Sequence, residues 1–141
     1  MNEPAVITFA EIEVGQKAHF EVRISEDLVA RFAEVSGDTN PLHMDEAYAT
    51  TTSFGGRIAH GMLGASFFSK LVGMHLPGRH ALYLSQKISF RKPCRIGMLV
   101  TVEGEVLQKV TAAKAVTLST RVLDEEGVCL IDGEAMVAML V

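Results

Sequence analysis

Residues 61–76 are the most constraining segment of the chain, because they are apolar nearly all the way round a helix. Their sequence is GMLGASFFSKLVGMHL, interrupted only by two serines, Lys70 and His75. A helix of this kind is stable only when most of its surface is buried. It is too short and too interrupted to span a membrane, so we expect it to lie inside the protein, against a β-sheet.

The rest of the chain supplies that sheet. Runs rich in β-branched and alternating apolar residues, bounded by turn residues, predict strands at residues 17–24, 81–90, 99–110, 113–124 and 128–140. The last four are joined by short connections, so we expect antiparallel neighbours. A long antiparallel sheet wrapped around one buried central helix is an α+β fold, and a chain of 141 residues fits one domain.

Helical patterns also precede the central helix. Residues 25–35 predict a helix with Ser25 as its N-cap, and residues 44–50 predict one or two helical turns capped by Asp45. Residues 36–61 otherwise read mostly as loop. A loop of this length inside a compact domain is usually functional, or else it contains an element that the pattern does not reveal.

One part of this loop, residues 36–43, combines turn residues with an acid and an imidazole. It reads SGDTNPLH, in which glycine, Asp38, asparagine and proline all suit a turn for backbone reasons alone. A turn has no need of His43. The segment therefore has two interpretations, a simple chain reversal or a pair of side chains that transfer protons.

Composition argues against several other functions. The formal net charge is −4 and basic residues form no run, so we expect no nucleic-acid partner. The start of the chain lacks the basic and apolar regions of a secretory signal, so we expect a cytoplasmic protein.

Cys94 and Cys129 form no CxxC pattern and are expected to be buried, reduced thiols. The histidines show no HxxxH or HExxH spacing, so we predict no metal or other cofactor, although distant segments can still build a metal site.

Three segments together resemble the MaoC-like (R)-specific enoyl-CoA hydratases, the hydratase-2 enzymes of the hotdog-fold superfamily. They are FAEVSGDTNPLHMDEAYA at residues 32–49, RIAHGML at 57–63 and YLSQKISFRKPCRIG at 83–97. The string G-D-x-N-P-x-H between two helices is specific, and the resemblance covers almost the whole chain. It implies a single hotdog domain over residues 1–141, a CoA thioester substrate, no metal, and a homodimer with its two sheets joined edge to edge.

The same resemblance implies roles for individual residues. Asp38 and His43 fall on the family's catalytic pair, Asn40 on its supporting amide, and Gly61 on the glycine whose N–H binds the thioester oxygen. Ser69 matches a helix serine near the family's active site. Hydration of a 2-enoyl thioester needs a group that takes a proton from the attacking water and a group that supplies one at C2, and an acid with an imidazole can do both. Which of the two takes the water proton is left open.

Other polar residues have plainer explanations. A histidine directly before a helix, such as His60, is expected to be a hydrogen-bonded structural residue, and serines in a helix can simply ease packing. Arg91, Lys92 and Arg95 are either a solvated edge or partners for the phosphates of CoA, since arginine suits phosphate geometry.

The predicted function is the reversible addition of water to trans-2-enoyl-CoA, giving (R)-3-hydroxyacyl-CoA. Three alternatives remain: a 3-hydroxyacyl-ACP dehydratase of fatty-acid synthesis, a hotdog thioesterase, and a non-catalytic acyl-binding module. Residues 61–76 contain no Asp or Glu, which by resemblance argues against a thioesterase. The sequence does not determine the acyl-chain length, the carrier, the oligomer beyond a dimer, or the pathway, whether polyester precursor supply, β-oxidation or fatty-acid synthesis.

Overall fold

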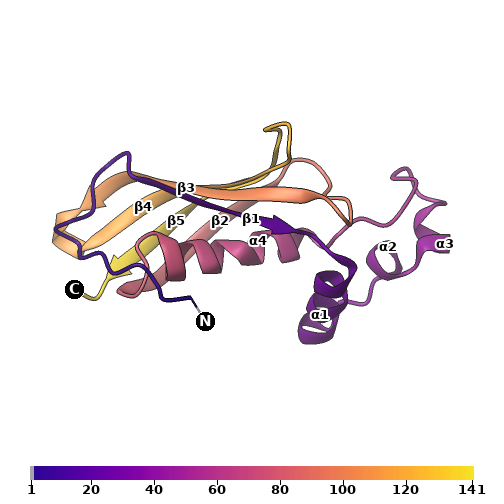
Figure 1. Cartoon of the computed structure of the whole chain (residues 1–141), viewed down its shortest axis with the longest axis horizontal. Coiled ribbons are helices and arrows are strands. Elements are labelled where there is room, and N and C mark those ends of the chain that lie inside the picture. Colours follow the sequence, from indigo (N-terminus) through magenta and orange to yellow (C-terminus); the bar gives the residue numbers. More distant parts are fainter. Residues whose placement is uncertain (1) are drawn as a thin grey trace.

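The computed structural model describes residues 2–141 and places one antiparallel sheet over one central helix (Figure 1). The strands are β1 (Lys17–Arg23), β2 (Ala81–Phe90), β3 (Leu99–Val110), β4 (Ala115–Leu123) and β5 (Cys129–Met139). The α-helices are α1 (Glu26–Ser36), α2 (Pro41–Met44), α3 (Glu46–Ala49) and the central α4 (Gly61–Lys70). A π-helical segment, Leu71–His75, continues α4, and a short 3-10 turn, Thr111–Ala113, joins β3 to β4.

The strand order in the sheet is β1-β3-β4-β5-β2, with every pair antiparallel. The expected pairing of consecutive strands holds for β3 with β4 and for β4 with β5. It is wrong for β2 and β3, because β2 pairs with β5 at the far edge instead. The connection over residues 91–98 is long enough to carry the chain across the end of the sheet, so the short-connection argument does not apply to it.

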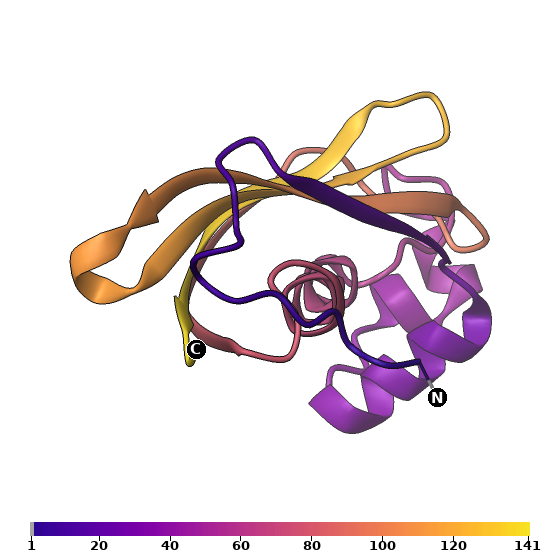
Figure 2. The same ribbon diagram turned by 60° about the vertical axis from the view of Figure 1, so that its left-hand side comes forward.

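The central helix lies in the concave face of the sheet, and Figure 2, nearly along the helix axis, shows the strands curving over it. Leu63 and Phe68 of α4 are buried in one cluster with valines of β3 and β4 and Ile131 of β5. Small residues allow the close approach: a Cβ at Gly64 would lie 2.6 Å from Ile131 Cδ1. This arrangement confirms the predicted α+β fold, and burial of apolar side chains between the two layers is the main stabilising term.

One face of α4 stays open in the protomer, contrary to the expectation of a helix buried nearly all round. Met62 is 54% exposed, and Ser66 and Ser69 on the same face are also exposed. The opposite face, which carries Leu63 and Phe68, is the one that packs on the sheet. One sheet therefore buries Leu63 and Phe68 but leaves Met62 exposed.

The three short helices α1, α2 and α3 lie together beyond one end of the sheet, near the N-terminus of α4 (Figure 1). The predicted caps are confirmed: Ser25 Oγ accepts from Leu28 N–H at 3.1 Å, and Asp45 Oδ1 accepts from Tyr48 N–H at 3.2 Å. The loop prediction missed α2, which begins at Pro41. Because this helix has only four residues, it carries no apolar periodicity that a sequence reading can detect.

Within residues 2–141, no helix is both long enough and apolar enough to cross a membrane.

Candidate active site

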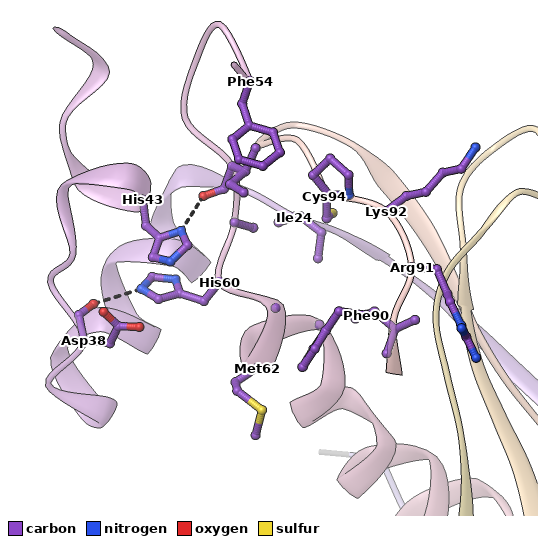
Figure 3. A pocket seen from close by; sticks show the side chains of 16 residues that line it. Ile24, Asp38, His43, Phe54, His60, Met62, Phe90, Arg91, Lys92 and Cys94 are labelled. Atoms are coloured by element: carbon purple, nitrogen blue, oxygen red, sulfur yellow. Dashed lines mark hydrogen bonds between the residues drawn. The ribbon is translucent and has the colours of Figure 1, made fainter. Parts of the chain in front are cut away.

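A largely apolar cavity of about 420 Å³ opens at the N-terminal end of α4. Asp38, His43, His60 and Gly61 line one side of it, and Figure 3 shows the first three gathered together. The remaining wall consists mainly of apolar side chains, which include Ile24, Phe54, Ile58, Met62, Phe90, Cys94 and Ile131. A concave apolar site with a few convergent polar groups is the usual form of a small-molecule site.

Asp38 is held at the cavity by the turn that ends α1. Gly37 closes that helix in the left-handed region, with φ of 77°, a conformation that glycine adopts without strain. The Asp38 carboxylate Oδ1 then accepts a hydrogen bond from Asn40 N–H at 3.1 Å. Asp38 thus forms the turn that the sequence suggested, while its side chain also reaches the cavity.

His43 is fixed in one tautomer by its backbone surroundings. Its Nδ1 lies 2.8 Å from the Ile58 carbonyl oxygen, and because a carbonyl can only accept, Nδ1 carries the hydrogen. In the neutral ring Nε2 then holds the free lone pair. His43 is therefore prepared to accept a proton at Nε2.

Arg57 clamps the backbone of the same residue. Its Nε–H donates to the His43 carbonyl oxygen at 2.8 Å, and its other guanidinium N–H meets Glu26 at 3.1 Å. The Arg57 side chain is only 16% exposed, whereas that of Glu26 is 76% exposed. Arg57 and the adjacent carbonyl of Ile58 hold His43 by its main chain and by its ring. The sequence reading did not single out Arg57.

Asn40 lies beside the pair as a capping residue rather than in the cavity wall. Its Oδ1 accepts from Leu42 N–H at 3.0 Å and begins α2, the helix that carries His43. This contact gives Asn40 a supporting role in the geometry of the loop.

His60 is a further polar residue of this site, and its surroundings were not evident from the sequence. It is 2% exposed, and its Nε2 lies 2.9 Å from the backbone oxygen of Asp38. Its ring packs on that of His43 with centroids 4.1 Å apart and on Phe32 with centroids 4.9 Å apart. The only sequence signal was a histidine placed directly before the glycine that opens the central helix.

Gly61 is the first residue of α4, so its N–H has no acceptor within the helix. Its lack of a side chain has one explanation in the protein itself, since a Cβ at this position would lie 2.8 Å from the ring of Phe90. Gly61 also lines the cavity, together with Asp38 and His43.

Ser69 lies on the exposed face of α4, about 12 Å from Gly61 at a rise of about 1.5 Å per residue. It is not among the residues that line the cavity of the protomer.

Arg91 and Lys92 line the cavity, and Arg91 also forms an ion pair with Asp132 at 3.1 Å. Arg95 instead borders a neighbouring hollow with Arg57 and Glu46.

Within residues 2–141, three of these side chains also form a group with the spacing of metal ligands. One ligand atom each from Asp38, His43 and His60 lies within 4.8 Å of the others. In addition, His43 Nδ1 and His60 Nε2 each contact a backbone carbonyl oxygen, a contact common around metal-binding histidines.

The two cysteines are only partly buried, not buried as expected, but their surroundings disfavour the thiolate. Burial raises the pKa of the Cys94 thiol, in the cavity wall, to about 11. Burial also raises the pKa of Cys129, with the neighbouring Asp132 carboxylate as a second cause. A raised pKa leaves little thiolate at neutral pH, so neither thiol is prepared to act as a nucleophile.

Comparison with known proteins gives one family and several close relatives. The family model described as the MaoC like domain matches residues 9–127. The (R)-specific enoyl-CoA hydratase of Aeromonas caviae is 45% identical over 128 residues, covering 91% of this chain and 96% of that protein. The 3-hydroxybutyryl-CoA dehydratase of Methylorubrum extorquens is 41% identical over 137 residues, covering 97% of this chain and 87% of that protein.

The solved structures agree with the sequence comparison. The unliganded R-hydratase PhaJ1 from Pseudomonas aeruginosa superposes with a TM-score of 0.93 at 43% identity, covering 98% of this chain and 88% of that one. The five-stranded antiparallel sheet around one central helix is thus the hotdog fold that the resemblance implied.

Proposed function

Because the chain belongs to the MaoC-like domain family, we infer that it is an (R)-specific enoyl-CoA hydratase. It is a hydro-lyase that adds water reversibly to a trans-2-enoyl-CoA and forms the (R)-3-hydroxyacyl-CoA. The observation that carries this inference is the placement of Asp38 and His43 on one wall of an apolar cavity, in a chain similar along nearly its whole length to such hydratases.

In the proposed reaction Asp38 and His43 share one water molecule. His43 Nε2 accepts a proton from the water as its oxygen attacks C3, since the bond from Nδ1 to Ile58 leaves that nitrogen free. Asp38 orients the water and stabilises the imidazolium that forms. Positioned acid–base groups of this kind typically contribute about 10²- to 10⁴-fold to the rate.

Asp38 and His43 neither gain nor lose a proton over the whole reaction. The water oxygen forms a bond to C3 while the C2=C3 electron pair moves toward the thioester carbonyl, giving an enolate-like state. The proton held by His43 then passes to C2, the carbonyl re-forms, and both residues return to their starting states. No external acid is required, because the added OH and H both derive from the same water.

In this reaction the Gly61 N–H stabilises the negative charge that develops on the thioester oxygen. Its N–H is one of the unsatisfied donors in the first turn of α4, at the end where the helix dipole amounts to about half a positive charge. A donor aimed at an oxygen that gains charge in the transition state favours reaction over simple binding. Asn40 supports this site by holding the start of α2.

We also propose that the protein is a homodimer. In the part of the chain that the structure describes, β2 is an edge strand of ten residues that pairs with β5 alone, and Leu82 and Leu84 on it are more than half exposed. A long edge with exposed apolar side chains favours pairing with another strand. A second copy joined along β2 would continue the sheet and pair this open edge. Light scattering tests this, and an active monomer at micromolar concentration would contradict it.

The deciding assay follows the loss of enone absorbance when crotonyl-CoA or longer 2-enoyl-CoAs are added. A hydratase consumes the enone without releasing thiol, whereas a thioesterase releases free CoA that a thiol reagent detects. The same substrates on acyl-carrier protein distinguish the dehydratase alternative, which would favour that carrier. An acyl-binding module would bind these thioesters and leave them unchanged.

A further inference from the structure

We propose that His60 is a positioning residue for the hydration reaction, joining the Asp38 loop, the His43 ring and the start of α4 in one fixed geometry. The proposal rests on the proposed function for its catalytic meaning and on the contacts of His60 for its structure. It assigns to His60 more than the structural role expected from the sequence.

The first contact fixes the tautomer of His60. Its Nε2 lies 2.9 Å from the Asp38 carbonyl oxygen, and because that oxygen can only accept, Nε2 carries the hydrogen. This bond holds the main chain of Asp38, so it sets where the carboxylate lies relative to His43. Asp38 lies in an exposed turn and its hydrogen bonds to Ser36 and Asn40 are local, so a bond from a distant segment matters for its position.

The second contact involves the other half of the pair. The His60 ring lies against the His43 ring, with a centroid distance of 4.1 Å and an interplanar angle of 31°. Phe32 of α1 supports His60 from another side at 4.9 Å. His43 therefore has the Ile58 carbonyl at its Nδ1 edge and the His60 ring at its face, and these two contacts restrict its rotation (Figure 3).

The third connection is through the chain. His60 is the N-cap residue of α4 and its carbonyl oxygen accepts from Leu63 N–H at 3.1 Å, so its position also sets that of Gly61. The three groups proposed to act on the water and on the thioester oxygen are thus connected through one buried residue, two by its side chain and Gly61 by its main chain. A shift of about 1 Å in such a constellation can lower a rate by about a hundredfold.

Packing alone does not explain a histidine at this position. Among the side chains of residues 2–141, Nδ1 of His60 is the buried polar atom that has no hydrogen-bond partner. A buried acceptor without a partner costs free energy, so an apolar ring of similar size would be more stable here if the role were only to fill space. The Nε2–H bond to Asp38 is what a histidine supplies and a phenylalanine does not.

Two variants separate the hydrogen bond from the ring. His60→Gln places an amide N–H at the same distance along the side chain as Nε2–H, and His60→Phe keeps a ring against His43 but has no donor. With crotonyl-CoA we expect His60→Phe to lower kcat by about tenfold to a hundredfold with little change in KM, because substrate contacts remain. We expect His60→Gln to keep most of the wild-type kcat.

Thermal melts and histidine NMR complete the test. A purely structural role, whichever way it changes Tm, would leave the kcat of the folded His60→Phe enzyme at the wild-type level, and that result would overturn the proposal. If His60→Phe does not fold, the kcat of His60→Gln decides, and a loss there as large as that of Asp38→Asn contradicts the proposal. The ¹⁵N spectrum of the wild type must show His60 as the Nε2–H tautomer, and this readout holds even if crotonyl-CoA is not the substrate.

Discussion

The ring of His43 is tied to the backbone of Ile58, fifteen residues further along the chain, by a hydrogen bond of 2.8 Å from Nδ1 to the carbonyl oxygen. This bond decides which nitrogen of the imidazole is available to the cavity. It connects the short helix α2 to the segment that leads into α4, so it fixes these two parts of the site relative to each other. The proposed chemistry depends on this connection as much as on the identity of the side chains.

Replacing Asp38 or His43 with asparagine tests the pair with little change to the fold. The amide nitrogen of His43→Asn takes the place of Nδ1 and can still donate to Ile58, and Asp38→Asn keeps the oxygen that accepts from Asn40 N–H. We expect each to lower kcat for 2-enoyl-CoA hydration by about 10²- to 10⁴-fold with a nearly unchanged Tm. The double variant should be far from additive, because both residues act on one water. Retention of more than about a tenth of wild-type kcat by either single variant, well short of this acid–base effect, would mean that SGDTNPLH is only a turn.

Arg57 should matter for rate and not only for stability. Arg57→Ala removes the hydrogen bond to the His43 carbonyl, so we expect kcat to fall by about tenfold or more, as for a misplaced catalytic group. Glu26→Gln is the matched control, because it weakens only the ion pair between Arg57 and the exposed Glu26 carboxylate. Exposed ion pairs contribute little to stability. Equal losses in the two variants, measured with crotonyl-CoA, would show that the ion pair and not the bond to His43 is what counts.

The strands and the central helix could be predicted because their signals are local. Alternating residues in 99–110 and the apolar run in 61–76 carry the periodicity of their own element, and the structure confirms both. The pairing of β2 with β5 could not be predicted in this way, since two strands with similar patterns are joined only through the packing of the whole sheet.

The site was predictable in part for the same reason. The order of Asp38, Asn40 and His43 is a short motif, and the prediction that they act in catalysis still awaits the variants described above. The contacts of His60 and Arg57 could not be foreseen. They depend on a segment that returns to α1 and α2 from more than a dozen positions away, and no spacing in the sequence records such a contact.

Chelation should leave the activity unchanged. The proposed proton cycle needs only Asp38, His43 and the Gly61 N–H, so no step calls for a Lewis acid. The test is a demanding one here, because the donors of Asp38, His43 and His60 lie within 4.8 Å of one another. Hydration is measured after exhaustive dialysis against a chelator and again after adding Zn²⁺. Activity that disappears on dialysis and returns with the metal would replace the proposed cycle with a metal-assisted one.

Stability at alkaline pH should depend on Tyr83. Burial raises the pKa of its phenol from 10.0 to about 12, and the hydroxyl donates to Gln86 Oε1. Below pH 10 the Tyr83 phenol keeps its proton in both the folded and the unfolded chain, so its contribution to the free energy of unfolding is fully present. Between pH 10 and 12 only the unfolded chain loses the proton, so stability falls as pH rises. In urea melts, the stability of the wild type relative to Tyr83→Phe should fall as pH rises across this range, and a difference that stays constant would contradict the raised pKa.

The lack of a side chain at Gly61 has two possible causes, and a paired substitution separates them. A Cβ there would lie 2.8 Å from the Phe90 ring, so Gly61→Ala must displace that ring, which is 53% exposed and free to move outward. We expect Gly61→Ala to lower Tm slightly and kcat by about tenfold to a thousandfold, since the methyl group also obstructs the approach of the thioester oxygen to the N–H. Adding Phe90→Ala removes the clash within the protein but not the obstruction. If Gly61 acts as an oxyanion donor, the double variant should lose the strain and stay well below the kcat of Phe90→Ala alone. A double variant with the same kcat as Phe90→Ala would instead show that glycine is needed at this position only to make room for the Phe90 ring.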